Sequence, residues 1–385
     1  MSKLRSGEWV EVRSKEEILR TLDNDGCLEG LPFMPQMFQY CGQTFRIYKR
    51  AHKTCDTITG KWLGRKLANG VHLDLRCDGK AYGNCQAACL IFWKEAWLRP
   101  VIGGLTSAKS SSRSCAPSSG MIGSAMCTED DVCKATDVRD ADGEPIYRCQ
   151  ATRLLDYTAP LPWWDVRQYV EDYTSGNATL GRIFIGLAYV GYYFGSLAYR
   201  GRLGRPGRWL YDRFQGMRGG FPFPRRQGNI PFGAPTPACD LNLQPGELVR
   251  VKSFEEILAS LDTAGKNRGL GFDAELVPYC GRTYRVRARV NSFIDEKTGR
   301  MIRLKTPAVQ LEGVCCQSRY SHNRMFCPRS IYSWWREIWL ERISEAAPAD
   351  LLASTGTIDH RENEKPSYVA GRSCTRNSPS VLKLD

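Results

Sequence analysis

The residues in this sequence that are best suited to chemistry are cysteines, of which there are 16. The tightest group lies in the segment CDGKAYGNCQAAC, which contains Cys77, Cys85 and Cys89. Cys41 and Cys55 precede it in the same part of the chain. Loop cysteines at such spacings can surround one zinc ion, which takes four thiolate or imidazole ligands. We therefore predict a zinc site with ligands from this set, whose binding free energy would contribute to folding.

A second group of potential ligands lies around the segment CCQSRYSHNRMFC. Its members are Cys280, Cys315, Cys316, His322 and Cys327. A third, loosely spaced set lies between the two groups and consists of Cys115, Cys127, Cys133 and Cys149. Two other interpretations stay open. The cysteines could be small buried hydrophobic residues, or they could hold an iron–sulfur cluster, although neither group has the spacing of a ferredoxin.

The composition of the chain limits its partners and its compartment. The 385 residues carry a net charge of +13, from 54 basic and 41 acidic residues. This length predicts two or three domains, and the basic balance favours acidic partners such as nucleic acid, anionic lipid or acidic glycans. The first residues lack the apolar core of a signal peptide, so we expect a cytoplasmic protein. In a reducing compartment, a cysteine-rich module more often binds a metal than forms disulfides.

The cysteine groups belong to an internal repeat. Residues 7–23, GEWVEVRSKEEILRTLD, match residues 246–262, GELVRVKSFEEILASLD, at eleven of seventeen positions, with an offset of 239 residues. The repeated unit closes on FWKEAWL in the first copy and on WWREIWL in the second. Such self-similarity predicts a tandem duplication of one structural module.

The alignment of the two copies separates the cysteines. Cys77 aligns with Cys315 after a one-residue slip, so both cysteine-rich loops precede the closing segment and are expected to have the same role. Cys55 aligns with the apolar Ile294. Of the five candidates for four zinc ligands in the first copy, Cys55 is therefore the one that we expect to lie outside the site.

Each copy opens with the pattern of a short strand followed by a helix. Alternating residues predict the strand, and Ser14 with Glu17, like Ser253 with Glu256, predicts a capping box at the start of the helix. A turn and closely spaced strands follow, an order that suits a small SH3-like barrel. We therefore predict a mainly β fold with inserted helices, in which two tandem SH3-like small barrels are joined by a partly helical, irregular middle region.

The domain boundaries follow from the repeat and from shifts in composition. They are 5–100 for the first module, 101–120 for a Ser-rich linker, 121–243 for the middle region, 244–343 for the second module and 344–385 for a disordered tail. Within the middle region we predict a helix at WWDVRQY, an apolar helix at 180–199 and an Arg-rich segment at 200–226.

The apolar helix and the Arg-rich segment suggest partners of their own. Residues 183–199 are uncharged and contain three glycines, which favours a helix buried in protein, with contact to a membrane as the alternative. Seventeen residues reach only the lower limit for a membrane span. The candidate anion-binding residues are Arg200, Arg202, Arg205 and Arg208. Few aromatic residues are interleaved with them, so nucleic acid is the less favoured partner of this segment.

Known catalytic motifs are missing from the sequence. It contains no P-loop, no GxGxxG, no HExxH and no GxSxG elbow. Glu95 and Glu337 occupy matching positions between tryptophans, and we interpret them as structural partners of an arginine such as Arg46 or Arg285 rather than as general bases.

The motifs YCG, FCPR and WREIWLER resemble those of a poorly characterised bacterial family of duplicated, cysteine-containing SH3-like modules. That family is associated with polysaccharide or secondary-metabolite gene clusters. The resemblance covers both modules and the WWDVRQY segment. It implies a bacterial cytosolic protein, but no reaction and no catalytic residues.

Three functions are compatible with these patterns. The leading hypothesis is a zinc-stabilised interaction or accessory protein that binds a protein partner, in the cytoplasm or at the periphery of a membrane. The second is a metal-dependent enzyme, or a subunit of one, that acts on a small molecule. The third is a nucleic-acid binder that uses the basic middle region.

Overall fold

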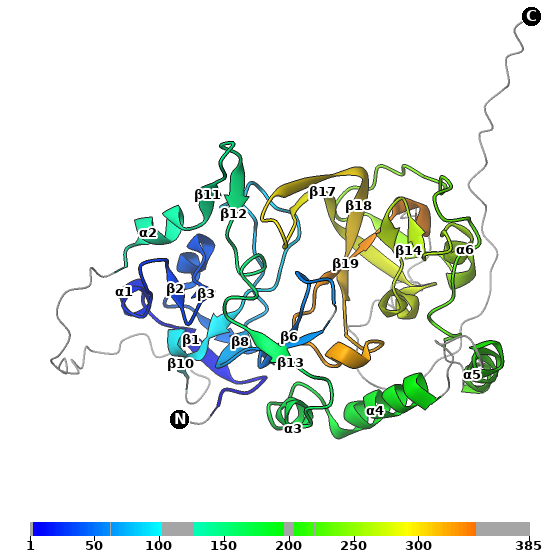
Figure 1. Cartoon of the computed structure of the whole chain (residues 1–385), viewed down its shortest axis with the longest axis horizontal. Coiled ribbons are helices and arrows are strands. Elements are labelled where there is room, and N and C mark those ends of the chain that lie inside the picture. Colours follow the sequence, from blue (N-terminus) through cyan, green and yellow to red (C-terminus); the bar gives the residue numbers. More distant parts are fainter. Residues whose placement is uncertain (1–2, 62, 102–126, 196–203, 219–220, 344–385) are drawn as a thin grey trace, which may run out of the picture.

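The computed structural model describes residues 3–61, 63–101, 127–195, 204–218 and 221–343. The first copy of the repeat and the second copy lie side by side, in blue and in yellow to orange (Figure 1). Helices from the middle region lie along one side of both copies. The predicted disordered tail and nearly all of the predicted Ser-rich linker lie outside the described residues.

The first copy consists of short elements. They are β1 (Trp9–Val12), α1 (Lys15–Leu19), β2 (Cys27–Leu28), β3 (Leu31–Pro32), η1 (Pro35–Tyr40), β4 (Thr44–Arg46), β5 (Lys49–Arg50), β6 (Lys53–Cys55), β7 (Gly64–Lys66), β8 (Gly70–His72), β9 (Trp93–Lys94), η2 (Glu95–Trp97) and β10 (Leu98–Pro100), where η denotes a 3-10 helix.

The second copy repeats this order with longer strands. Its elements are β14 (Leu248–Val251), α6 (Phe254–Ala259), β15 (Lys266–Asn267), β16 (Leu270–Gly271), η3 (Ala274–Tyr279), β17 (Thr283–Ile294), β18 (Met301–Cys315), η4 (His322–Arg324), β19 (Tyr332–Trp335), η5 (Glu337–Trp339) and β20 (Leu340–Arg342). With the offset of 239 residues, the continuous strand β17 corresponds to the three separate strands β4, β5 and β6.

The strand order is the same in both copies. In the second copy a five-stranded sheet runs β19-β18-β17-β14-β20, and in the first the equivalent strands are divided among three small sheets, β10-β1-β4, β5-β8-β9 and β13-β7-β6. Strand exceeds helix in the described residues, at 27% against 24%. The sheets in this part of the chain are small and antiparallel, and none of them closes into a barrel. The β-rich character is thus confirmed, whereas the two predicted SH3-like barrels are not.

An aromatic cluster forms the centre of each copy. In the first, the rings of Phe33 and Trp97 meet edge to face with centroids 5.1 Å apart. In the second, Phe272 and Trp339 repeat this contact at 5.2 Å. Both tryptophans are fully buried. Edge-to-face packing adds to the large apolar area that such side chains remove from water, so the closing segment of each repeat anchors its own core.

Both capping boxes predicted from the sequence are confirmed. The Ser14 hydroxyl accepts from the Glu17 N–H, and the Glu17 carboxylate accepts from the Ser14 N–H. Ser253 and Glu256 make the same reciprocal pair at the start of α6. Each box satisfies two backbone donors that a helix start would otherwise leave without a partner.

Removal of either cap is expected to have the same modest cost. Ser253→Ala and Ser14→Ala should each lower the free energy of unfolding by about 1 kcal/mol, because the N3 amide of each helix loses its acceptor. Urea denaturation of the two variants would measure this. Equal stability of both variants and the parent chain would show that the caps contribute nothing.

The two copies exchange cysteine-containing loops. The loop between β8 and β9 (residues 73–92, the first cysteine loop) reaches the second copy, where the Gln86 side-chain oxygen accepts from the N–H groups of Asn291 and Ser292. The loop between β18 and β19 (residues 316–331, the second cysteine loop) reaches the first copy, where Arg329 donates to the Thr57 hydroxyl at 2.8 Å. Each loop is therefore positioned by both copies.

The middle region supplies short strands and three longer helices. Its elements are α2 (Glu129–Lys134), β11 (Asp137–Arg139), β12 (Pro145–Tyr147), β13 (Ala159–Leu161), α3 (Arg167–Thr174), α4 (Leu180–Gly195) and α5 (Gly204–Arg218). Strand β13 pairs with β7 and so joins the first copy. The helix predicted at WWDVRQY begins only at Arg167, after both tryptophans.

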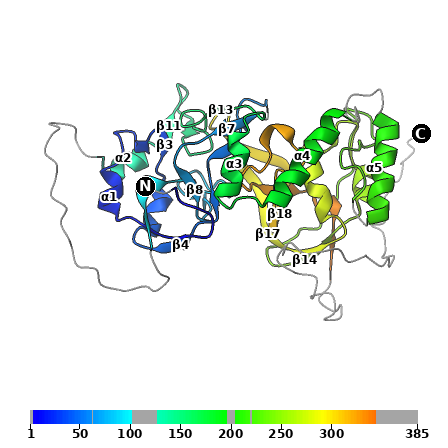
Figure 2. The same ribbon diagram turned by 90° about the horizontal axis from the view of Figure 1, so that it is seen from below.

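The predicted apolar helix corresponds to α4, although residues 196–199 lie outside the described part. Helices α3, α4 and α5 form a row on the near side of the molecule in Figure 2. Within the described residues, no helix combines the length and the apolar character needed to cross a membrane.

Candidate functional site

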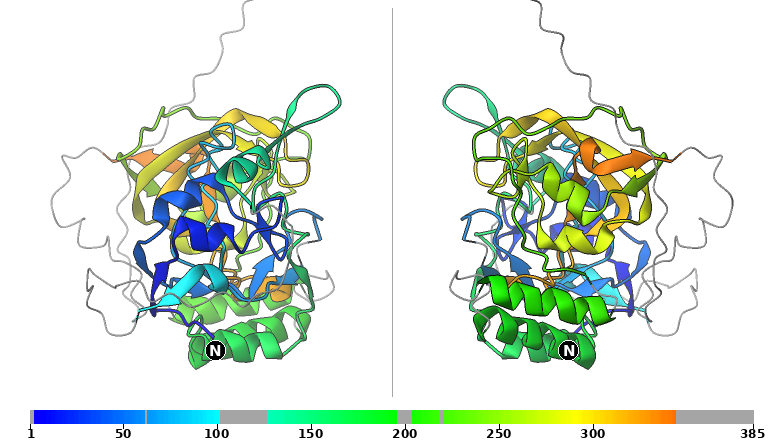
Figure 3. Two further views of the ribbon diagram at one scale, coloured as in Figure 1. Left: turned by 90° about the vertical axis from the view of Figure 1, so that its left-hand side faces the viewer. Right: turned by 90° about the vertical axis from the view of Figure 1, so that its right-hand side faces the viewer.

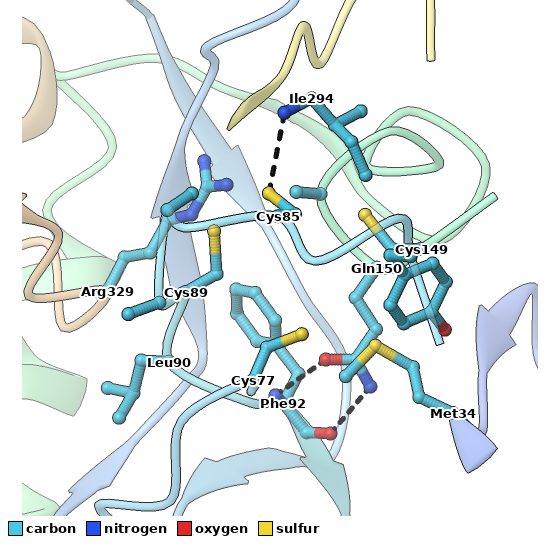
Figure 4. Close-up of a pocket in the computed structure, with 14 residues that line it drawn as sticks. Met34, Cys77, Cys85, Cys89, Leu90, Phe92, Cys149, Gln150, Ile294 and Arg329 are labelled. Atoms are coloured by element: carbon cyan, nitrogen blue, oxygen red, sulfur yellow. Dashed lines mark hydrogen bonds between the residues drawn. The ribbon is translucent and has the colours of Figure 1, made fainter. Parts of the chain in front are cut away.

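Four cysteines from two distant segments line one small cavity. Cys77, Cys85 and Cys89 come from the first cysteine loop, and Cys149 comes from the segment after β12 (Figure 4). We call this space the cysteine cavity. Its volume is about 30 Å³, enough for one water molecule or one ion. The rest of its wall consists of Met34, Tyr82, Ala87, Ala88, Leu90, Phe92, Gln150, Ala151, Ile294 and Arg329.

The first cysteine loop is closed by its own backbone. The Cys77 N–H donates to the Cys89 carbonyl at 2.8 Å, and the Cys85 N–H donates to the Tyr82 carbonyl at 3.1 Å. Gly79 has a φ of +71°, and a Cβ at this position would lie 2.0 Å from the carbonyl oxygen of Cys85. Only glycine permits so close an approach. The segment therefore forms a tight turn, and this turn places its three cysteines in the same wall of the cysteine cavity.

Gln150 fixes the segment that carries Cys149. The Gln150 side-chain oxygen accepts from the Phe92 N–H at 2.8 Å, and its amide nitrogen donates to the carbonyls of Phe92 and Pro32 at 2.9 and 3.0 Å. Gln150 is buried with all these bonds satisfied, which holds the neighbouring Cys149 against the first cysteine loop. The sequence placed Cys149 in a separate, loosely spaced set, because nothing local connects it with residues 77–89.

Hydrogen-bond donors and one cation surround the thiols. The Ile294 N–H donates to the Cys85 sulfur at 3.4 Å, and the Gln36 amide donates to the Cys77 sulfur at 3.2 Å. The buried Arg329 guanidinium lies in the wall and pairs with Glu296 at 2.9 Å. N–H donors and positive charge near sulfur stabilise a thiolate, as the outer shell of a metal site does.

For three of the four cysteines the uncharged thiol is the stable form. Burial raises the pKa of the Cys77 thiol to about 12. Burial also raises the pKa of Cys149 and places the pKa of Cys89 far above its usual value. At neutral pH these groups are therefore protonated unless a cation stabilises their thiolates.

The other cysteines predicted for this site lie elsewhere. Cys41 follows η1 and is absent from the wall of the cysteine cavity, as is Cys55. Cys55 and Cys327 are both buried, and the Cys327 thiol donates to the Cys55 sulfur. This bond, together with Arg329 and Arg324, lowers the pKa of Cys55. Cys55 thus belongs to the contact between the first copy and the second cysteine loop.

The second predicted set does not gather around one point. Cys315 accepts from Arg76 at 3.4 Å, and Cys316 contacts the Ser318 hydroxyl at 3.6 Å. His322 packs against the Trp163 ring, with centroids 6.3 Å apart. Burial raises the pKa of Cys280 to about 12, and this residue caps η3. Throughout the described part of the chain, no group of three or more histidine, cysteine, aspartate or glutamate side chains is arranged to hold a metal ion.

The candidate anion-binding residues are described only in part. Arg200 and Arg202 lie outside the described residues, as does Cys115 of the third cysteine set. Arg205 is exposed on α5. Arg208 donates to the Gly204 carbonyl at 3.1 Å, and its guanidinium carbon lies 6.0 Å from the centroid of the Phe223 ring.

A buried polar cluster, which no sequence pattern indicated, attaches α3 to the first copy. Lys53 pairs with Asp172, and both are buried. The His52 ring nitrogen Nε2 lies 3.4 Å from the Asp172 carboxylate. Arg50, also buried, pairs with Glu171 at 2.8 Å and with Glu95. Because these charges neutralise one another, we assign the cluster to the docking of α3 and not to catalysis.

The arginine partners expected for the two repeated glutamates were wrong. Glu95 pairs with Arg50, and Glu337 pairs with Arg289 at 3.0 Å. These two arginines are themselves equivalent in the repeat. The expected partner Arg46 instead donates to the Gly7 carbonyl, and Arg285 donates to that of Gly246.

Comparison with protein-family models, with curated proteins and with solved structures found no match for this chain.

Proposed function

We propose that this chain is a zinc-stabilised accessory protein that binds a protein partner, with one ion held by Cys77, Cys85, Cys89 and Cys149. The observation that supports the proposal most directly is the convergence of four thiols from two distant segments on the cysteine cavity. Free cysteine is a small hydrophobic residue that any apolar side chain could replace. Here four cysteines lie in one wall, beside an arginine and two N–H donors. These are the surroundings that a metal ion with four thiolate ligands requires.

The size of the cavity favours a single ion. A volume of about 30 Å³ suits one ion, and an iron–sulfur cluster with its inorganic sulfides needs more room. The four sulfur atoms are not arranged around one point, so binding would draw them together by rotation about their χ1 bonds. A site with four cysteine ligands leaves no open position for a substrate, which favours a structural role over catalysis.

Each copy is proposed to be an SH3-like module, which would supply the surface for the partner. The shared strand order supports this interpretation. In each copy the equivalent strands are neighbours in the order fifth, first, second, third and fourth. In both copies a 3-10 helix, η2 or η5, separates the fourth strand from the fifth. The cytoplasmic location and the membership of a bacterial family of such modules stay predictions.

The proposal is tested by the metal content of the full chain purified without oxygen. We expect close to one zinc per chain, and a cobalt-substituted sample with the absorption of thiolate ligation. Cys149→Ser should lose most of the metal, because Cys149 supplies one of four ligands. Cys41→Ser is the matched control, since Cys41 lies outside the cavity, and it should keep the metal.

Two results would overturn the proposed site. A parent chain that contains no metal and melts at the same temperature with and without chelator would leave the thiols as core residues only. Loss of metal from Cys41→Ser with retention in Cys149→Ser would move the site to the set expected from the sequence.

A further inference from the structure

The outward face of α4 is apolar where a surface helix is usually charged. Leu180 is 52% exposed, Phe184 is 70% exposed and Ile185 is 72% exposed. Arg182 is the one charged residue among residues 180–195 of this helix. The opposite side of α4 packs on the second copy, where Gly186 lies against the Phe326 ring. The apolar face therefore points away from the protein that anchors the helix.

The neighbouring helices extend this apolar surface. On α3, Val170 is 61% exposed, and Trp164 just before the helix is 67% exposed. On α5, Trp209, Leu210 and Met217 are 64%, 65% and 76% exposed. In both side views the green helices of the middle region lie along the lower side of the molecule, beyond the strands (Figure 3). An open apolar groove of about 470 Å³ runs between α3 and α4.

The charges on this side of the molecule are arranged asymmetrically. Arg205 and Arg213 are exposed on α5, among its exposed apolar residues. The acidic residue of that helix, Asp212, is half-buried, and its carboxylate accepts from the Phe223 N–H. The exposed surface of α5 therefore combines tryptophan and aliphatic side chains with cations. That combination is typical of helices that lie in the headgroup layer of a membrane.

We propose that α3, α4 and α5 together bind the surface of an anionic lipid bilayer, with the helices lying in the plane of the interface. Three observations favour lipid over a protein partner. The apolar residues are spread over three helices rather than confined to the groove, tryptophans occur on two of the three segments, and the exposed charges are positive.

The proposal is tested by co-sedimentation of the full chain with vesicles. We expect binding to vesicles of phosphatidylcholine and phosphatidylserine in equal parts, and little binding to phosphatidylcholine alone, because anionic lipid attracts the arginines. The double variant Phe184→Ser with Ile185→Ser should weaken binding roughly tenfold, since these side chains would enter the interface. Arg205→Gln with Arg213→Gln should weaken binding to the anionic vesicles and remove much of its salt dependence.

The control replaces an exposed apolar residue on a different element. Ile302 on β18 is 40% exposed, and Ile302→Ser should bind vesicles like the parent chain. Equal binding to neutral and anionic vesicles would overturn the role of the arginines. Failure of the parent chain to bind anionic vesicles would overturn the proposal outright. A dimer that dissociates in the Phe184 and Ile185 variant, without vesicle binding by the parent, would identify a second copy as the occupant.

Discussion

Asp172→Ala is expected to lower the free energy of unfolding by about 3–5 kcal/mol, because it leaves a buried lysine without its counterion. Asp172 is 0% exposed and Lys53 is 2% exposed. The Lys53 ammonium otherwise donates to the Gln168 side-chain oxygen at 3.4 Å. It also faces the rings of Tyr169 and Phe326, at 5.1 and 5.6 Å from their centroids. Aromatic faces attract a cation but do not replace a carboxylate. Urea denaturation at neutral pH would measure the loss.

The pH dependence of the variant separates this explanation from a simple loss of packing. Burial lowers the pKa of Lys53 below 10.5, and Asp172 opposes this shift. Without Asp172 the folded pKa falls further, so between that value and 10.5 the unfolded chain binds more protons than the folded chain. The stability of Asp172→Ala should therefore rise more steeply than that of the parent chain as the pH increases toward 10.5.

A double variant provides the control. Lys53→Met with Asp172→Leu removes both charges while keeping apolar volume, and it should be considerably more stable than Asp172→Ala. The repeat also isolates the pair, since the residue equivalent to Lys53 is Ser292. If the double variant were as unstable as Asp172→Ala at every pH, the cost would come from packing and not from the unpaired lysine.

Local features of the fold could be predicted from the sequence because neighbouring residues determine them. The capping boxes at Ser14 and Ser253 involve partners three residues apart, and both are present. The repeat placed equivalent elements correctly, including the closing segments with Trp97 and Trp339. It did not determine how strands join into sheets. The residues of the single strand β17 in the second copy correspond to three separate strands, β4, β5 and β6, in the first copy.

The composition of the cysteine cavity shows the limit of the same reasoning. Cys77, Cys85 and Cys89 are close in the chain, so their spacing predicted that they share one loop. Cys149 joins them through the bonds of Gln150 to Phe92 and Pro32, which connect segments far apart in sequence. No residue pattern marks such contacts.

The repeat alignment was informative about Cys55 in an unexpected way. Its counterpart Ile294 lies in the wall of the cysteine cavity, and Cys55 lies beside Cys327 of the second cysteine loop. Each of these two equivalent residues thus lies against the cysteine loop of the other copy. Alignment shows which positions correspond, but the exchange of loops between copies follows from tertiary packing alone.

The two repeated glutamates yield the second prediction with a large expected effect. Glu337→Ala should lower the free energy of unfolding by about 3–5 kcal/mol, because it leaves Arg289 without its carboxylate partner and the buried N–H of Leu243 without its acceptor. The Glu337 carboxylate accepts from the N–H groups of Leu241, Asn242 and Leu243 and pairs with Arg289 at 3.0 Å. Its side chain is only 4% exposed.

Glu95→Ala is the matched control from the first copy. The Glu95 side chain is 22% exposed, and its partner Arg50 keeps a second carboxylate, that of Glu171, at 2.8 Å. The variant should therefore cost only about 1 kcal/mol, the value of one hydrogen bond whose donor retains another acceptor. Urea denaturation of both variants would compare the copies directly. Equal losses would contradict this reasoning, because they would mean that the repeated position, and not the number of groups bound to the carboxylate, sets the cost.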